Sequence, residues 1–228
     1  RLLLSEGAHA DAAEVIAQHR EISEGEGRAQ REIELAFLYI DHLDKPQDAL
    51  AAAERALELR PRDPDAIAIL ARLVEVEGTR ARAATVLQAA YADLGDARRE
   101  GQALRVMLET EEDEANRLEL QVKLTDVEEK KLSSPSAAFD VVLSALTEFP
   151  SEIMLWDRAQ ELSVKAGRPT DLSEAYRAHI ITADQEARRL TRDVELELSD
   201  RAATLHDEQL GDSDGALPYL KRILAMEP

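Results

Sequence analysis

Residues 31–95 decide the fold of this chain, and they are REIELAFLYIDHLDKPQDALAAAERALELRPRDPDAIAILARLVEVEGTRARAATVLQAAYADLG. The stretch contains two helix-turn-helix units in one register, 34 residues apart. The matching positions are Ala49 and Ala83, Ala53 and Leu87, Ala56 and Ala90, and Pro61 and Gly95. Because one helix pair is too small to bury its own apolar stripe, each pair must pack on the next. The spacing therefore predicts a stack of helix pairs.

Small side chains explain why the pairs can pack closely. Ala49, Ala53 and Ala56 lie at i, i+4 and i+7, which is one stripe of an α-helix. Such a stripe lets a neighbouring helix approach to the short end of the usual ~8–10 Å interaxial range. Pro61 then ends the helix, because proline lacks the N–H and clashes with the preceding turn.

Several groups of residues carry a family resemblance. They are Leu35-Ala36-x-x-Tyr39, Ala49-x-x-x-Ala53-x-x-Ala56 and Pro61; then Leu70-Ala71, Gly78, Ala83, Leu87 and Ala90; Ala138, Val142, Ala145 and Pro150; Trp156, Gly167 and Tyr176; and Ala216, Leu220, Ile223 and Pro228. Together they resemble the tetratricopeptide repeat (TPR) family over most of the chain. The resemblance implies an all-α, right-handed α-solenoid of stacked antiparallel helix pairs, with roughly 12 to 13 helices. The half-TPR pattern of RNA-processing scaffolds implies the same architecture and is the nearest alternative.

The expected organisation is one TPR-like solenoid over residues 1–228. Its parts are a truncated unit 1–27, pairs 28–61 and 64–95, an extra helix 97–110, and pairs 113–150, 151–183 and 184–228. Within the last pair we expect one long helix over about 184–209, and a kink or late helix start at Pro218. Residues 1–7 are typical of a helix tail that ends at a turn glycine, so we expect a fragment of a longer protein.

A larger repeat links the two halves of the chain at an offset of 89 residues. Leu43, Pro46, Ala49, Ala56, Leu57 and Pro61 recur as Leu132, Pro135, Ala138, Ala145, Leu146 and Pro150. Gly78 and Gly167 continue the match. Six matches at one offset indicate a duplicated pair of helix pairs.

Composition limits the partners. The net charge of −19 disfavours nucleic acid and anionic membrane surfaces, and it is compatible with a basic protein partner. The simpler interpretation is that carboxylates keep an Ala- and Leu-rich chain soluble. The 22 Arg against 6 Lys are typical of a bacterial genomic base composition. The absence of Cys rules out disulfides and thiolate sites, and it weakly favours the cytoplasm.

No motif predicts catalysis or a cofactor. The five histidines are never at i, i+4 spacing, so we expect no metal site. His19 and His179 occupy small-residue positions and should be partly buried, whereas Asp207 and Glu208 beside His206 should be solvated carboxylates and not metal ligands. Residues 211–215 (GDSDG) should form a turn with helix-capping oxygens. We expect neither enzymatic activity nor a bound cofactor.

The resemblance places ligands on the first helices of the pairs, which line a concave groove. Transferred residue by residue, it implies partner-binding positions at Asp65, Arg72 and Glu75 on the helix 64–77, and at Met154, Asp157, Glu161 and Lys165 on the helix 151–166. The alternative is that these are ordinary solvated residues. The family's chaperone-tail clamp needs Lys and Asn on successive first helices, and the one Asn, Asn116, is not placed there. We therefore expect a non-catalytic scaffold for a peptide or protein partner; a spacer or self-association module is the alternative.

Overall fold

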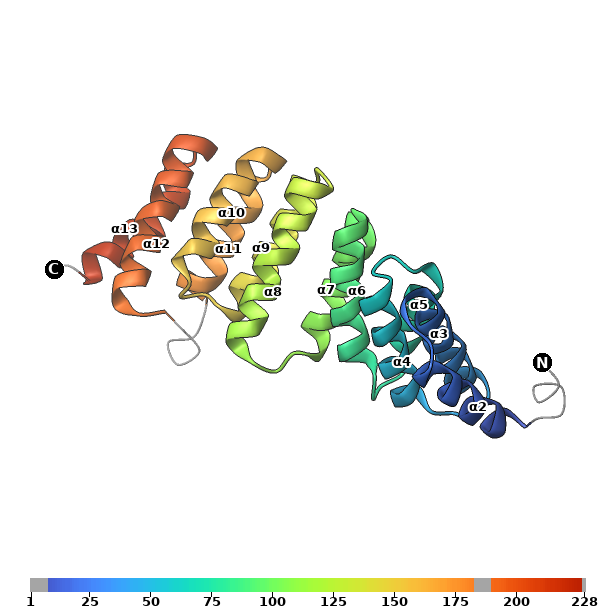
Figure 1. Cartoon of the computed structure of the whole chain (residues 1–228). Helices are drawn as coiled ribbons and strands as arrows, with labels where there is room; N and C mark the ends of the chain where they lie inside the picture. The colour runs from blue at the N-terminus through green and yellow to red at the C-terminus, as the bar shows by residue number, and fades with distance from the viewer. Residues whose placement is uncertain (1–7, 183–189, 227–228) are drawn as a thin grey trace. The chain divides into compact units, whose positions relative to one another are not determined.

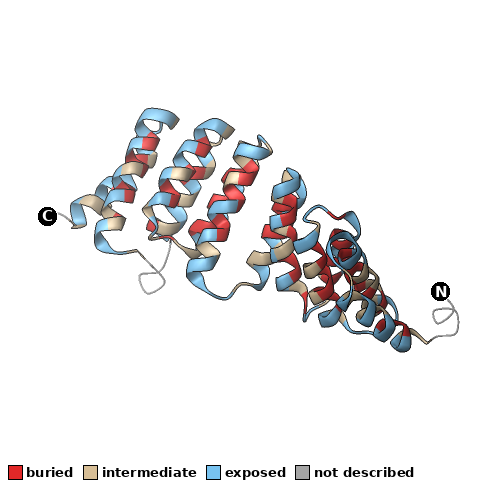
Figure 2. Cartoon of the chain, in the orientation of Figure 1, coloured by how far each residue is buried: buried red, intermediate tan, exposed pale blue. Residues whose placement is uncertain are grey.

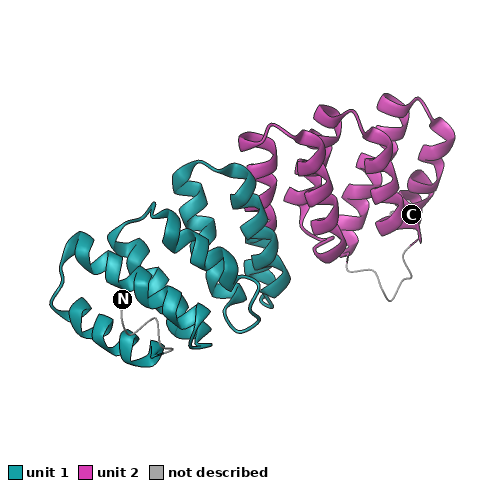
Figure 3. Ribbon diagram, turned by 90° about the vertical axis from the view of Figure 1, so that its right-hand side faces the viewer, with its two compact units in different colours: residues 1–120 teal, residues 121–228 magenta. Residues whose placement is uncertain are grey.

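The computed structural model describes residues 8–182 and 190–226. The described residues form twelve α-helices and three π-helical segments, and they contain no strand (Figure 1). The helices pack in consecutive pairs, which confirms the predicted all-α repeat fold and its helix number. The chain divides into two compact units, residues 1–120 and 121–228, coloured separately in Figure 3. The arrangement of both units in one continuous solenoid over residues 1–228 stays a prediction.

Unit 1 consists of six complete helices and the start of a seventh. They are α2 (His9–Glu21), α3 (Gly25–Asp41), α4 (Pro46–Leu59), α5 (Pro64–Leu73), α6 (Arg80–Leu94), α7 (Ala97–Thr110) and the first residues of α8 (Glu114–Asp126). From α2 to α7 each helix packs on the next one in sequence. The predicted extra helix over 97–110 is thus present, and it packs on α6.

Unit 2 repeats this arrangement. It contains the end of α8, η1 (Val127–Lys131), α9 (Pro135–Glu148), α10 (Ile153–Ala166), α11 (Pro169–Tyr176), η2 (Arg177–Thr182), α12 (Arg192–Thr204), η3 (Leu205–Leu210) and α13 (Ser213–Met226). From η1 to α13 the successive helices are in contact.

Fully buried small residues form the contacts between helices. Ala49, Ala53 and Ala56 are completely inaccessible to solvent, as are their unit 2 counterparts Ala138 and Ala145. Figure 2 shows that the buried residues lie along the sides of the helices that face their neighbours. The stripe predicted from the sequence is therefore the packing surface.

The 89-residue offset is also visible in the backbone. Asp44 and Ser133 are the two described non-glycine residues with positive φ, 48° and 54°. The next residue donates its N–H to matching carbonyls in both turns, Lys45 to Tyr39 at 2.9 Å and Ser134 to Glu128 at 2.8 Å. A left-handed residue between a long helix and a Pro-initiated helix thus occurs in both units.

Two helix ends differ from the predictions. Helix α5 ends at Leu73 instead of residue 77, because the buried Thr79 hydroxyl donates to the Leu73 carbonyl at 2.7 Å and holds a turn there. Helix α3 begins at Gly25, three residues before the predicted start of the pair 28–61.

The predicted long helix over 184–209 is wrong at residues 190–191. The Thr191 hydroxyl accepts the Val194 N–H, and α12 begins at Arg192. Residues 184–189 of that prediction, and the predicted helix tail at 1–7, lie outside the described residues. Of the two alternatives at Pro218, the late helix start is wrong, because α13 begins at Ser213 and contains the proline, and the kink stays a prediction.

Glycine at the left-handed turn positions should stabilise the fold. A side chain at positive φ costs about 1 kcal/mol that glycine does not incur. We expect Ser133→Gly to raise the free energy of unfolding by up to about 1 kcal/mol in urea titrations. The matched helical substitution Ala51→Gly should lower it by about 1 kcal/mol. A loss of stability in both variants would contradict this interpretation of the turn.

Candidate protein-interaction surfaces

One hollow of unit 1 has an apolar floor and a rim of arginines. It has a volume of about 710 Å³ and is bounded by residues of α5, α6 and α7 and of the turn before α5. Its lining residues are Arg62, Pro64, Ile67, Ala68, Ala71, Arg72, Tyr91, Leu94, Arg99 and Gln102. The small Ala68 and Ala71 leave space above the α5 surface, so the hollow can accept an apolar side chain.

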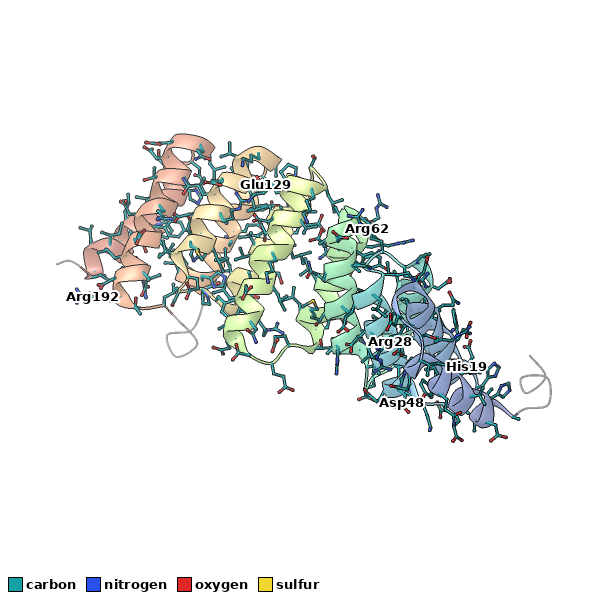
Figure 4. All side chains as sticks on the ribbon, viewed as in Figure 1. His19, Arg28, Asp48, Arg62, Glu129 and Arg192 are labelled. Atoms are coloured by element: carbon teal, nitrogen blue, oxygen red, sulfur yellow. The ribbon has the colours of Figure 1, made fainter. Side chains whose placement is uncertain are left out.

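Each rim arginine has a carboxylate beside it. Arg62 Nε donates to Asp93 at 2.8 Å, and Figure 4 labels Arg62. Arg72 Nη2 lies 2.5 Å from an Asp41 oxygen, and Arg99 lies over the Tyr91 ring at 5.7 Å. The ion pair with Asp93 raises the pKa of Arg62. Exposed pairs of this kind contribute about 0–1 kcal/mol, so a ligand carboxylate can replace one at little cost.

The structure separates the three partner-binding residues predicted in unit 1. Arg72 lines the hollow, together with Ala68 from the same helix. Asp65 is exposed on the first turn of α5 and is not among the lining residues. Glu75 lies beyond the end of α5, in the turn that Thr79 holds, so its expected place on the first helix is wrong.

In unit 2 the structure brings three of the four predicted residues together. Asp157, Glu161 and Lys165 border one open hollow of about 630 Å³ along α10. All three are engaged within the chain: Asp157 with Arg201 at 2.6 Å, Glu161 with Arg158 at 2.9 Å, and Lys165 with Glu129 at 2.7 Å. Met154 is 56 % exposed and is not among these lining residues.

These pairs belong to a repeated pattern that sequence reasoning missed. In unit 1, Arg72 of α5 reaches back to Asp41 of α3. In unit 2, Arg158 of α10 reaches back to Asp126 of α8 at 3.4 Å and also pairs with Glu129, which Figure 4 labels. Arg201 of α12 likewise reaches back to Asp157 of α10. Three first helices, α5, α10 and α12, are therefore each linked to the preceding first helix of their unit by an arginine–carboxylate pair.

Ser173, His206 and Asp212 form a polar cluster between α11 and η3. Ser173 Oγ lies 2.8 Å from His206 Nε2, and His206 Nδ1 lies 3.3 Å from an Asp212 oxygen. The residue types match a nucleophile relay, but Ser173 and His206 are buried, so a substrate carbonyl cannot reach the hydroxyl. Asp207 and Glu208 beside this histidine are exposed, as predicted, whereas the His206 ring is buried and fills space that Gly215 leaves open.

Of the three other predictions about histidines and capping, two are confirmed and one is wrong. His179 is half-buried and meets the Trp156 ring edge-on, which confirms its packing role. His19 is exposed on α2 and points to solvent in Figure 4, so its expected burial is wrong. Asp212 accepts the Gly215 N–H at 3.0 Å, which confirms the capping turn.

The described residues contain neither a cluster of metal ligands nor a membrane-spanning helix. Over residues 8–182 and 190–226, no three His, Asp or Glu side chains cluster as metal ligands would. None of the helices in those ranges has the length and apolar character needed to cross a bilayer.

Unit 1 contains a buried charge network. Glu32 of α3 is fully buried and accepts two hydrogen bonds from Arg55 of α4, at 2.8 and 2.9 Å. Arg20 of α2 lies 3.8 Å from the same carboxylate. The hydrogen bond to Glu32 raises the pKa of Arg55. Three successive helices are thus tied together through one carboxylate.

Removing Arg55 should destabilise unit 1, because the Glu32 carboxylate would stay buried with only Arg20 nearby. We expect Arg55→Ala to lower the free energy of unfolding by about 2–4 kcal/mol in urea titrations. Glu32→Leu in the same background should recover much of that loss. Arg98→Ala on the exposed side of α7 is the control and should change little. A small loss of unfolding free energy in Arg55→Ala would show that water solvates the Glu32 carboxylate in place of Arg55, and it would contradict this interpretation.

In unit 2 the buried aromatic residues include one unsatisfied hydroxyl. Trp156 stacks on Tyr176 at 4.7 Å and donates its indole N–H to the Pro150 carbonyl at 2.9 Å. The Tyr176 hydroxyl has no hydrogen-bond partner among the described residues. Burial raises the pKa of Tyr176 to about 12.

The raised pKa predicts a loss of stability at alkaline pH. An unfolded tyrosine loses its proton near pH 10, whereas the folded one keeps it until about pH 12. The stability that the protonated Tyr176 side chain contributes is therefore complete below about pH 10, and it is lost as pH rises toward 12. Tyr176→Phe should reduce this fall, and at pH 7 it should leave the denaturation midpoint unchanged or higher. A lower midpoint at pH 7 would show that the hydroxyl has a stabilising partner.

Comparisons with known proteins find similarity among solved structures alone. No family model matches the chain, and no curated protein sequence matches it significantly. Among solved structures, it is similar to the C-terminal part of a TPR repeat-containing protein from Cytophaga hutchinsonii. The identity is 14 %, the match covers 100 % of this chain and 93 % of that chain, and the TM-score is 0.37.

Proposed function

We propose that this chain is a non-catalytic interaction scaffold whose unit 1 hollow binds a peptide segment of a protein partner. The observation that carries the proposal is the hollow itself, with its apolar floor at Ile67, Ala68 and Leu94 and arginines around it. A concave apolar site with a few placed polar groups is the usual form of a ligand site.

The rim favours a particular kind of segment. Arg62, Arg72 and Arg99 present planar guanidinium groups that bind carboxylates in two-point geometry. Each now faces an aspartate of the chain in an exposed or half-exposed pair, and a ligand carboxylate can take that place. The best-fitting ligand is therefore an apolar side chain flanked by Asp or Glu. This differs from the basic partner that net charge alone favours.

A peptide selection tests the proposal. A random peptide library displayed on phage would be selected against the wild-type chain and counter-selected against Ala68→Arg, which fills the hollow. We expect enriched peptides with an apolar residue next to carboxylates. Their affinity, measured by fluorescence anisotropy, should fall at least about tenfold in Ala68→Arg.

Ala81→Arg is the matched control, because Ala81 is exposed on α6 and lies outside the hollow. It should leave the affinity unchanged. Selected peptides that bind Ala68→Arg as tightly as wild type, or a selection that enriches no sequence, would overturn the proposal.

A further inference from the structure

A second hollow of unit 1 forms a groove between two second helices, α4 and α6. It has a volume of about 470 Å³. Its apolar lining includes Leu57 of α4, Pro61 of the turn that follows, and Val86 and Ala89 of α6. We call this hollow the second-helix groove. It shares no lining residue with the arginine-rimmed hollow, so the two surfaces can be tested separately.

The helices next in sequence do not cover this groove. Helix α4 packs on α3 and α5, and α6 packs on α5 and α7, so both second helices already have their neighbours in place. Even so, Val86 is only half-buried, and Pro61 and Ala89 are exposed. The groove is therefore an open surface within the completed stack of unit 1.

Three carboxylates border the groove. The Glu54 side chain is 14 % exposed, and Arg82, whose side chain is 70 % exposed, reaches it from α6 at 2.5 Å. Glu58 is exposed and has no ion-pair partner among residues 8–182 and 190–226. Asp93 pairs with Arg62, which is not a lining residue of the groove. Because the Arg82 side chain can turn to solvent, a ligand cation can take its place on Glu54 at little cost.

Unit 2 has the same apolar residues without the carboxylates. At the 89-residue offset, Leu57, Pro61 and Ala89 correspond to Leu146, Pro150 and Ala178, whereas Glu54, Glu58 and Asp93 correspond to Leu143, Thr147 and Thr182. Packing of the second helices therefore does not require the acidic residues. Solubility does not account for Glu54 either, because most of its side chain is covered. A cationic ligand of unit 1 accounts for all three carboxylates.

We propose that the second-helix groove binds a lysine side chain from a basic segment of a partner protein. Lysine combines a long aliphatic stem with a cationic head, which matches an apolar lining bordered by carboxylates. The stem lies on Leu57 and Val86, and the ammonium group replaces Arg82. It can donate to Glu54 and Glu58 together, because these residues lie one helical turn apart. The net charge of −19 attracts such a segment at long range.

Peptides that differ only in charge or in stem length test the groove. The probe is a fluorescein-labelled peptide of repeated Gly-Lys-Leu units, and in two matched peptides glutamate or diaminobutyrate replaces the lysine. Fluorescence anisotropy at physiological ionic strength should detect binding of the lysine peptide to the full chain. The diaminobutyrate peptide has the same charge on a shorter stem and should bind at least about tenfold more weakly. The glutamate peptide should not bind.

Variants of the chain locate the site. Glu54→Gln combined with Glu58→Gln should lower the affinity for the lysine peptide at least about tenfold. The matched control combines Glu14→Gln with Glu112→Gln, which removes the same charge from exposed positions outside the groove and should change the affinity less than about twofold. Ala68→Arg, which fills the arginine-rimmed hollow, should bind the lysine peptide as wild type does, so this inference and the proposed function can fail separately.

Circular dichroism verifies that each variant keeps its helix content. Equal losses in the two double variants would show that overall charge alone attracts the peptide, and equal binding of the diaminobutyrate peptide would show that the stem has no site. Either result, or undetectable binding of the lysine peptide, would overturn the proposal. Light scattering that shows a wild-type oligomer dissociated by the groove variant would also overturn it, because the occupant would then be a second copy.

Discussion

The fold depends on one geometric constraint: the second helix of each pair is apolar on two sides, and its own partner covers only one of them. The fully buried alanines of α4, Ala49, Ala53 and Ala56, bring the pair together at close range, while Leu50 and Leu57 must be covered from elsewhere. The next helix in sequence covers them, and the same holds for α6, α9 and α11. Packing between neighbours in sequence is therefore sufficient to build each unit, as in other repeat proteins.

Charged residues align neighbouring helices with one another more than they stabilise the packing. Arg72, Arg158 and Arg201 each link one first helix to the preceding one, and such partly exposed pairs contribute only about 0–1 kcal/mol each. The Glu32–Arg55 contact is different, because the carboxylate is fully buried and its loss of solvation must be offset by two direct hydrogen bonds. An acidic chain thus uses many of its arginines internally.

The sequence predicted the elements whose ends carry local signals. The bounds of α7 match the predicted 97–110 because a turn glycine and a capping aspartate lie directly before its start. The end of α5 was missed because a hydrogen bond from Thr79, six residues beyond Leu73, decides it. The surroundings of His206 and Glu32 were missed for the same reason, since their partners Ser173 and Arg55 lie 33 and 23 residues away. Candidate surfaces are harder to predict than helices, because four of the seven transferred residues turn out to be paired within the chain, at Arg72, Asp157, Glu161 and Lys165.

Small side chains have opposite effects on the two sides of a helix, and this difference accounts for the surfaces of the molecule. On a buried side, alanine shortens the distance between helices and removes space. On the exposed side of α5, Ala68 and Ala71 leave the space that Arg62, Arg72 and Tyr91 border, and the hollow of unit 1 results.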